Sequence, residues 1–110
     1  MLKIQLIGNV GLDSEIRQVN GKKAITFNVA ENQSFTNGKG EKISKTTWVS
    51  CTLWRDADQS TKLAEYLLKG TKVYVEGRPE FKTYTSNGET GVSINLTVIH
   101  LELLDSKKED

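Results

Sequence analysis

Two tryptophans stand six residues apart in the segment Trp48-Val49-Ser50-Cys51-Thr52-Leu53-Trp54. Side chains alternate between the two faces of a β-strand, so a strand here places both indoles beside Ser50 and Thr52, opposite an apolar, core-facing set. Large exposed aromatic side chains are unfavourable unless something covers them. The pattern predicts a stacking surface for a planar ligand. The alternatives are that a bulge turns one ring inward, or that a loop or a second subunit covers both.

Two further aromatic residues fall in polar hairpin segments, and cationic residues accompany all four rings. Every nucleobase has a π-face on which rings stack without regard to sequence, while cations follow the phosphates. The alternative is that the hairpin aromatics only pack against their own hairpins. Arg55 directly follows Trp54, so we expect a ring and a cation to act there together. The pattern predicts a surface for single-stranded nucleic acid formed by Phe35, Trp48, Trp54, Tyr84, Lys42, Lys45, Arg55 and Lys82.

Catalytic patterns are weak by comparison. Asp56 and Asp58 have no histidine or carboxylate cluster nearby in the sequence, and Gly38-Lys39-Gly40 lacks the spacing of a phosphate-binding loop. Cys51 is the only cysteine, which excludes an intrachain disulfide and a zinc-finger cluster. We expect neither catalysis nor a metal or other cofactor.

Charge is unevenly distributed along the 110 residues. The formal net charge is +1, but the stretch from Arg17 to Arg55 contains seven basic and two acidic residues, a balance of +5. A solvated surface could carry such a stretch, and so could a nucleic-acid interface. The chain opens without the long apolar run of a signal peptide and contains no run long enough to span a membrane. We expect a cytoplasmic protein that does not contact membranes.

The hydrophobic pattern predicts the elements that must position these residues. Alternation indicates strands at 2–6, 15–19, 22–30, 46–54, 72–76 and 92–103, with a change of phase near Val98 that indicates a bulge. Asn20-Gly21 and Asn87-Gly88 are hairpin turn signals. The polar segment 31–44 is expected to form a long, mobile hairpin loop. Ser60 to Lys69 has a capping serine, an apolar stripe and a terminal Gly70, which together predict a helix.

The first two strand segments count as one long, bent strand, so the order is five strands with one helix between the third and the fourth. This order predicts an all-β fold with one helix, the five-stranded OB-fold barrel. Residues 1–104 form one predicted domain, followed by a short charged tail at 105–110. The long first strand, Met1–Val10, has an edge that can pair with a second copy, so we expect a homo-oligomer with Ile7 and Val10 covered at its interface.

Several segments resemble the bacterial single-stranded DNA-binding protein family. They are Ile7-Gly8-Asn9-Val10-Gly11, the run Thr47–Trp54, and Ala64-Glu65-Tyr66-Leu67-Leu68-Lys69-Gly70 followed by Val73-Tyr74-Val75-Glu76-Gly77. The resemblance covers roughly residues 3–104. It implies an OB-fold that binds and protects single-stranded DNA during replication, recombination and repair. It also implies a homotetramer without a cofactor. Four aromatic positions of the family correspond to Phe35, Trp48, Trp54 and Tyr84.

The chain departs from the family pattern at its end. Family members usually continue into a flexible linker and an acidic tip that recruits other proteins, whereas this sequence ends at Lys107-Lys108-Glu109-Asp110. Recruitment of tail-binding partners is therefore in doubt. The alternative within the fold is a primosomal replication protein that bridges helicase-loading partners. An OB-fold nuclease would need a carboxylate cluster that the sequence lacks, and an RNA or oligosaccharide binder would use similar stacking.

Overall fold

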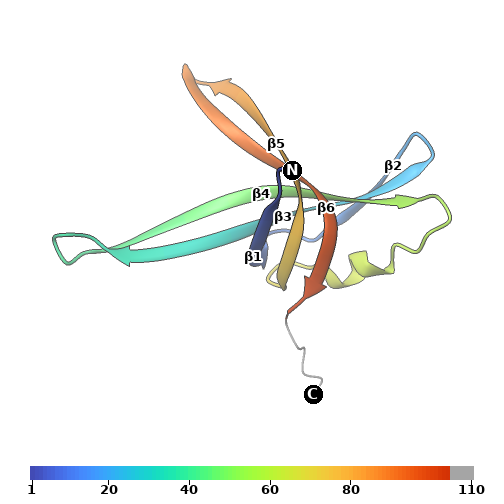
Figure 1. Cartoon of the computed structure of the whole chain (residues 1–110), viewed down its shortest axis with the longest axis horizontal. Helices are drawn as coiled ribbons and strands as arrows, with labels where there is room; N and C mark the ends of the chain where they lie inside the picture. The colour runs from blue at the N-terminus through green and yellow to red at the C-terminus, as the bar shows by residue number, and fades with distance from the viewer. Residues whose placement is uncertain (105–110) are drawn as a thin grey trace.

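The computed structural model describes residues 1–104 as a β-barrel from which two long hairpins project (Figure 1). The charged tail expected at 105–110 lies outside the described residues. One sheet runs in the order β1-β5-β6-β4-β3-β2, and an additional β1–β3 pairing closes the barrel. The elements are β1 (Ile4–Val10), β2 (Glu15–Val19), β3 (Lys22–Thr36), β4 (Lys42–Asp56), the 3-10 helix η1 (Lys62–Tyr66), β5 (Lys72–Ser86) and β6 (Glu89–Leu103).

β1 and β2 are two parts of the first barrel strand, because both pair with β3. Val10 of β1 lies opposite Val29, and Glu15 of β2 lies opposite Thr26. The turn between them begins at Gly11. The closed five-stranded barrel is therefore confirmed, with its first strand bent as the sequence predicts.

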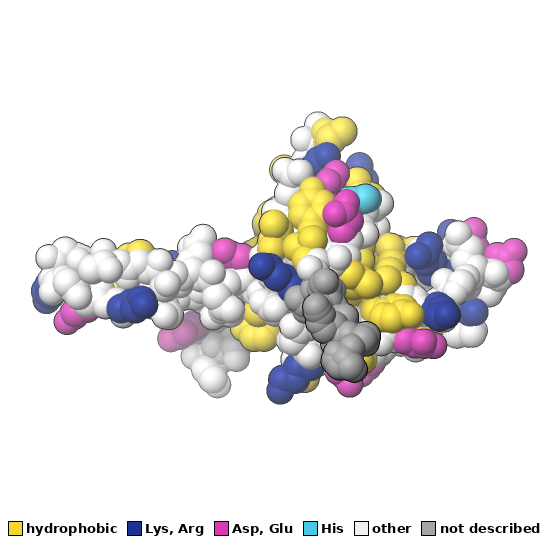
Figure 2. Space-filling model, turned by 90° about the horizontal axis from the view of Figure 1, so that it is seen from below, with side chains coloured by type: hydrophobic (Ala, Val, Ile, Leu, Met, Phe, Trp, Pro, Cys, Tyr) yellow, Lys and Arg dark blue, Asp and Glu magenta, His cyan; other side chains and the backbone are white. Residues whose placement is uncertain are grey.

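The core consists of every second residue along the barrel strands, the residues whose side chains face inward. Ile25 and Val29 of β3, Val73 and Val75 of β5, and Leu96 of β6 are fully buried. Their spacing of two residues is the reason why alternation located these strands. Val10 is also buried within this core, so the expectation that a second subunit covers it is wrong; Ile7 remains exposed. Figure 2 shows hydrophobic side chains gathered over the middle of the molecule, with mostly polar side chains on the long arm.

A bulge in β6 confirms the predicted change of phase near Val98. Glu76 lies opposite His100 and Gly77 lies opposite Val98, so Ile99 is the extra residue. A bulge shifts the residues after it to the other face, which is why Val98 and then Leu101 face the core, while Ile99 and His100 are exposed.

The helix predicted at 60–69 is wrong, because only η1 forms there, without a side-chain cap. The segment makes hydrogen bonds with the turn between β1 and β2 instead. The Ser14 hydroxyl donates to the Ala64 carbonyl over 2.9 Å, and the Ser14 amide donates to the Leu67 carbonyl over 2.9 Å. The Lys69 amide donates to Asp13 Oδ1 over 2.9 Å. These tertiary bonds replace the helical ladder while still burying Leu67 in the barrel.

The long loop predicted at 31–44 is also wrong. β3 and β4 stay paired as far as Thr36 and Lys42, so only residues 37–41 form the turn. The Asn37 side chain holds that turn by accepting the amides of Lys39 and Glu41 over 2.8 and 3.0 Å. Both faces of this arm are solvated, so its strands lack the hydrophobic alternation on which the prediction depended. The arm extends well away from the barrel (Figure 1). Phe35 of β3 and Lys42 and Lys45 of β4 belong to it.

Candidate nucleic-acid interface

The two tryptophans face outward from β4, as the alternation predicts. Trp48 is 54% exposed and Trp54 is 43% exposed, whereas the intervening Val49 and Cys51 are buried. Each indole lies opposite a small residue of β3, since Ala30 pairs with Trp48 and Ala24 with Trp54. Both alanines are buried. The methyl group of each alanine supports one side of the neighbouring indole ring. The rest of the ring surface stays available for stacking.

Trp48 is further positioned by Gly11, in the turn between β1 and β2. A β-carbon at Gly11 would lie 2.4 Å from Cζ3 of Trp48 and 2.8 Å from Cη2, so the ring occupies the space that a side chain would fill. The glycine is required here for space rather than for a left-handed backbone conformation, because its φ is not positive.

Gly11→Ala should therefore move the Trp48 ring without unfolding the barrel. We expect a urea midpoint close to that of the parent protein, a shifted tryptophan emission spectrum, and weaker binding of single-stranded DNA by several-fold. In a Trp48→Ala background the same change should have no further effect on binding, since the ring that it displaces is absent. Equal additional losses in both backgrounds would show that Gly11 acts independently of the ring.

Tyr84 and Lys82 share the outward face of the two tryptophans, because the strands are in register across the sheet. Ser50 of β4 lies opposite Asn95 of β6, and Asn95 lies opposite Glu80 of β5. Lys82 and Tyr84 follow Glu80 at intervals of two residues, so they lie on the same side of the sheet. Tyr84 is 51% exposed, and a β-carbon at its cross-strand partner Gly91 would lie 2.5 Å from the phenol ring. The ring thus lies over a glycine, with its other face free.

Phe35 and Lys45 lie on the other face of the β3–β4 arm. Phe35 pairs with Ile43, which is an odd-numbered residue of β4 and therefore shares a side with Lys45 rather than with Trp48. Lys42, by contrast, lies on the tryptophan side. Phe35 is 50% exposed, so it is available for stacking. A nucleic-acid strand could contact both Phe35 and Trp48 only by passing around the arm.

Arg55 does not share a face with Trp54. Alternation along β4 places it with Leu53 and Cys51, and its Nε is buried without a hydrogen-bond partner among the described residues. The expectation that one base meets the ring of Trp54 and the guanidinium of Arg55 together is therefore not supported by the arrangement.

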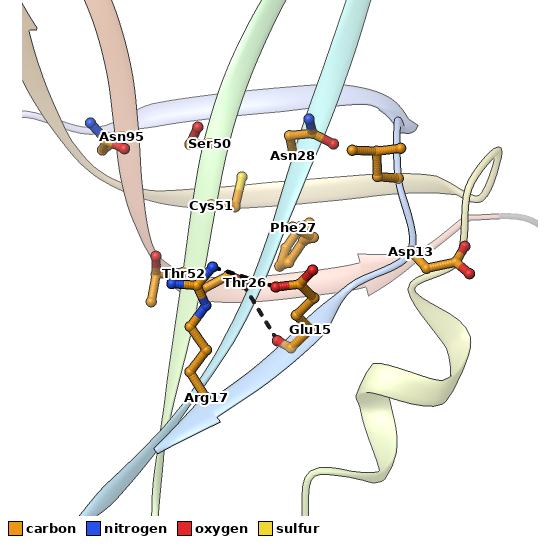
Figure 3. Close-up of a pocket in the computed structure, with 11 residues that line it drawn as sticks. Asp13, Glu15, Arg17, Thr26, Phe27, Asn28, Ser50, Cys51, Thr52 and Asn95 are labelled. Atoms are coloured by element: carbon orange, nitrogen blue, oxygen red, sulfur yellow. Dashed lines mark hydrogen bonds and ion pairs between the residues drawn. The ribbon is translucent and has the colours of Figure 1, made fainter. Parts of the chain in front are cut away.

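Other polar residues belong to the tryptophan face although the sequence alone did not single them out for it. A groove of about 330 Å³ crosses β2, β3, β4 and β6 (Figure 3). It is lined by neutral side chains between the two tryptophans, and by Asp13, Glu15 and Arg17 at its β2 side. Arg17 is within 3.4 Å of Glu15 Oε1. Exposed Arg78 of β5 lies opposite Thr97 and adds a second cation. Only the cross-strand register could have located these residues.

Shifted pKa values occur in the barrel core and on the outer surface near β1 and β5. Burial raises the pKa of the Cys51 thiol to about 12, so the thiol stays protonated. Just before β1, Lys3 Nζ donates a hydrogen bond to Glu76 Oε2 of β5 over 2.8 Å. This bond lowers the pKa of the Glu76 carboxyl. Within residues 1–104 no three His, Cys, Asp or Glu side chains form a group that could hold a metal ion. No helix of that part is long and apolar enough to cross a membrane.

Known proteins resemble the chain over almost its whole length. A single-stranded DNA-binding protein of Lactiplantibacillus plantarum is 34% identical over 94% of this chain and 51% of its own length. One from Neisseria meningitidis is 31% identical over 98% of this chain and 62% of its own length. The Plasmodium falciparum protein in the solved structure "SSB complex with ssDNA" is 32% identical over 96% of both chains, with a TM-score of 0.73.

The chain therefore spans about half to three fifths of the length of these two bacterial relatives. None of these matches supports the alternative of a primosomal replication protein. The profile of the Single-strand binding protein family matches residues 1–104. The chain belongs to the single-strand binding protein family.

Proposed function

We propose that this protein binds single-stranded DNA without sequence preference and protects it during replication, recombination and repair. The observation that carries the proposal is the single outward face on which Trp48, Trp54 and Tyr84 stand half-exposed, with Lys82 and Arg78 among them. Stacking and phosphate neutralisation together hold an unpaired strand, whereas a duplex offers no free base faces. The relatives named as single-stranded DNA-binding proteins support this proposal. Its proposed place of action is the cytoplasm, without a cofactor.

A fluorescence titration tests the proposal directly. Oligo-dT should quench the tryptophan emission, because bases stack on the two exposed indoles, and duplex DNA of equal length should leave it nearly unchanged. Oligo-U in the same assay measures discrimination against RNA. The DNA recovered after incubation with Mg²⁺ should remain full length, since we propose no catalysis. Equal quenching by duplex, or cleavage that copurifies with the protein, would contradict the proposal.

We also propose that the protein forms a homo-oligomer, which in this family would be a tetramer, through the edge of β1. Ile4–Gly8 pair with β5 on one side only; β3 joins β1 at Asn9 and Val10. An unpaired edge of this length is a template for another strand, and Ile7 is 52% exposed beside it. A second β1 would cover both.

Light scattering at micromolar concentration should give a mass that is a multiple of the 12.3 kDa protomer. Ile7→Glu should reduce this mass, because it introduces charge at the proposed interface. Ile16→Glu is the matched control, since Ile16 is comparably exposed but lies on β2. A monomer mass for the parent protein, or equal losses in both variants, would refute pairing through β1.

A further inference from the structure

Two rows of neutral polar side chains separate the tryptophans on the outward face. Asn28, Ser50 and Asn95 lie opposite one another across β3, β4 and β6. The next row, two residues along each strand, consists of Thr26, Thr52 and Thr97. Figure 3 shows Asn28, Ser50 and Asn95 side by side, with the first two threonines in the second row. We call these six residues the polar strip.

The polar strip holds hydrogen-bonding groups that the protein itself does not use. Among the described residues, the side chains of Asn28, Ser50, Thr52 and Asn95 have no hydrogen-bond partner. The Oδ1 atom of Asn28 is buried near Gly11, so Asn28 can offer a ligand only its Nδ2 donor. Only Thr26 makes a side-chain bond, a long one of 3.5 Å to the Glu15 carbonyl. Five of the six residues line the groove of about 330 Å³, so they share one hollow rather than scattered surface positions.

A strand of DNA that stacks on both tryptophans must cross the polar strip. Six residues of β-strand span about 20 Å, whereas stacked nucleotides advance about 3.4 Å each. Several nucleotides therefore lie between the two rings. The strip contains no aromatic side chain and no charge, so it can hold these nucleotides neither by stacking nor by neutralising phosphates.

Resting on the proposed function, we propose that the polar strip binds the Watson–Crick edges of the unpaired bases that lie between Trp48 and Trp54. The Asn95 amide presents an N–H donor beside a carbonyl acceptor, and hydroxyls both donate and accept. Each of the four bases carries a donor next to an acceptor on its Watson–Crick edge. The same amide therefore complements any base, provided that the base is unpaired.

This arrangement adds a second mechanism of selection for single strands. Stacking requires a free base face, while the strip requires a free base edge, which pairing in a duplex occupies. Each side of the strip is bordered by one arginine and one carboxylate, Arg17 with Glu15 on β2 and Arg78 with Glu80 on β5. The margins thus carry balanced charge, and the strip itself contributes through hydrogen bonds to bases.

A base that stacks but cannot form hydrogen bonds tests the inference. Difluorotoluene has the shape of thymine without its donors and acceptors. An oligo-dT with difluorotoluene at its central positions should bind the parent protein about three- to tenfold more weakly than unmodified oligo-dT, as expected for the loss of a hydrogen bond. Asn95→Ala and Thr52→Val should each weaken binding of oligo-dT by a similar factor and leave binding of the modified strand unchanged.

Thr47→Val is the matched control, because Thr47 is exposed on the opposite face of β4. It should not change the affinity for either oligonucleotide. Thermal melting of every variant establishes that each is folded. If the parent protein binds both oligonucleotides equally and the strip variants match it, the inference is wrong while the proposed function stands. If the parent protein fails to bind oligo-dT at all, the proposed function fails first.

Discussion

Replacing either tryptophan by alanine should weaken binding of oligo-dT about tenfold or more. Stacking of a base on an aromatic ring contributes roughly 1–3 kcal/mol by alanine substitution, and each factor of ten corresponds to about 1.4 kcal/mol. Trp48 and Trp54 are about half-exposed on one face, so each can support a separate base. Trp48→Phe and Trp54→Phe keep a ring and should retain most of the affinity.

Phe81 offers the matched aromatic control. It is 53% exposed, but alternation along β5 places it on the face opposite Lys82 and Tyr84. Phe81→Ala should leave the affinity within about twofold of the parent value, in keeping with a substitution away from the site. A comparable loss in Phe81→Ala, or parent-like binding by both tryptophan variants, would show that the β4 face is not the stacking surface.

The salt dependence of the same variants separates rings from charges. Each phosphate contact on a single strand contributes a slope of about −0.7 in log affinity against log salt concentration. Lys82→Ala should lower affinity and flatten the slope by about this amount, since Lys82 lies on the tryptophan face. The tryptophan variants should lower affinity at every salt concentration with the slope unchanged. The salt dependence of Lys45→Ala and Arg55→Ala tells whether the DNA strand also contacts the other face of β4.

Local alternation was sufficient for the central part of the site. A strand that contains Val49, Cys51 and Leu53 has an apolar side that only a core can accept, so the opposite side, with its two tryptophans, had to be exposed. The bulge near Val98 was predictable for the same reason, since the apolar positions change phase there. These features depend on burial within one strand, which the sequence records directly.

Other features depend on contacts between distant segments. The helix expected at 60–69 does not form, because the segment accepts a hydrogen bond from the Ser14 hydroxyl and donates one to Asp13, contacts that no local propensity contains. The arm that carries Phe35 is paired although both of its faces are solvated and mostly polar, so hydrophobic spacing could not reveal it. The face that Phe35 occupies is set by its pairing with Ile43, and the polar strip exists only because three strands are in register.

The largest effect on stability should come from Gly77→Ala. A β-carbon at Gly77 would lie 2.1 Å from the Thr97 carbonyl oxygen and 3.0 Å from the Val98 α-carbon. These are backbone atoms of the paired strand, so no side chain can rotate away to relieve the clash. Overpacking a core costs typically about 1–3 kcal/mol and occasionally more, and we expect this variant at or above the upper end.

Gly38→Ala is the control, because nothing lies within 4 Å of a β-carbon there and its φ is not positive. Its stability should stay within about 0.5 kcal/mol of the parent value. Urea unfolding at one fixed protein concentration makes the comparison, since oligomer formation would make stability depend on concentration. Gly77 lies where the β6 bulge meets β5, before the hairpin that carries Tyr84 and Lys82. If Gly77→Ala separates β5 from β6 there, it should also reduce DNA binding. A urea midpoint equal to that of the parent protein would mean that the two strands are not held this closely.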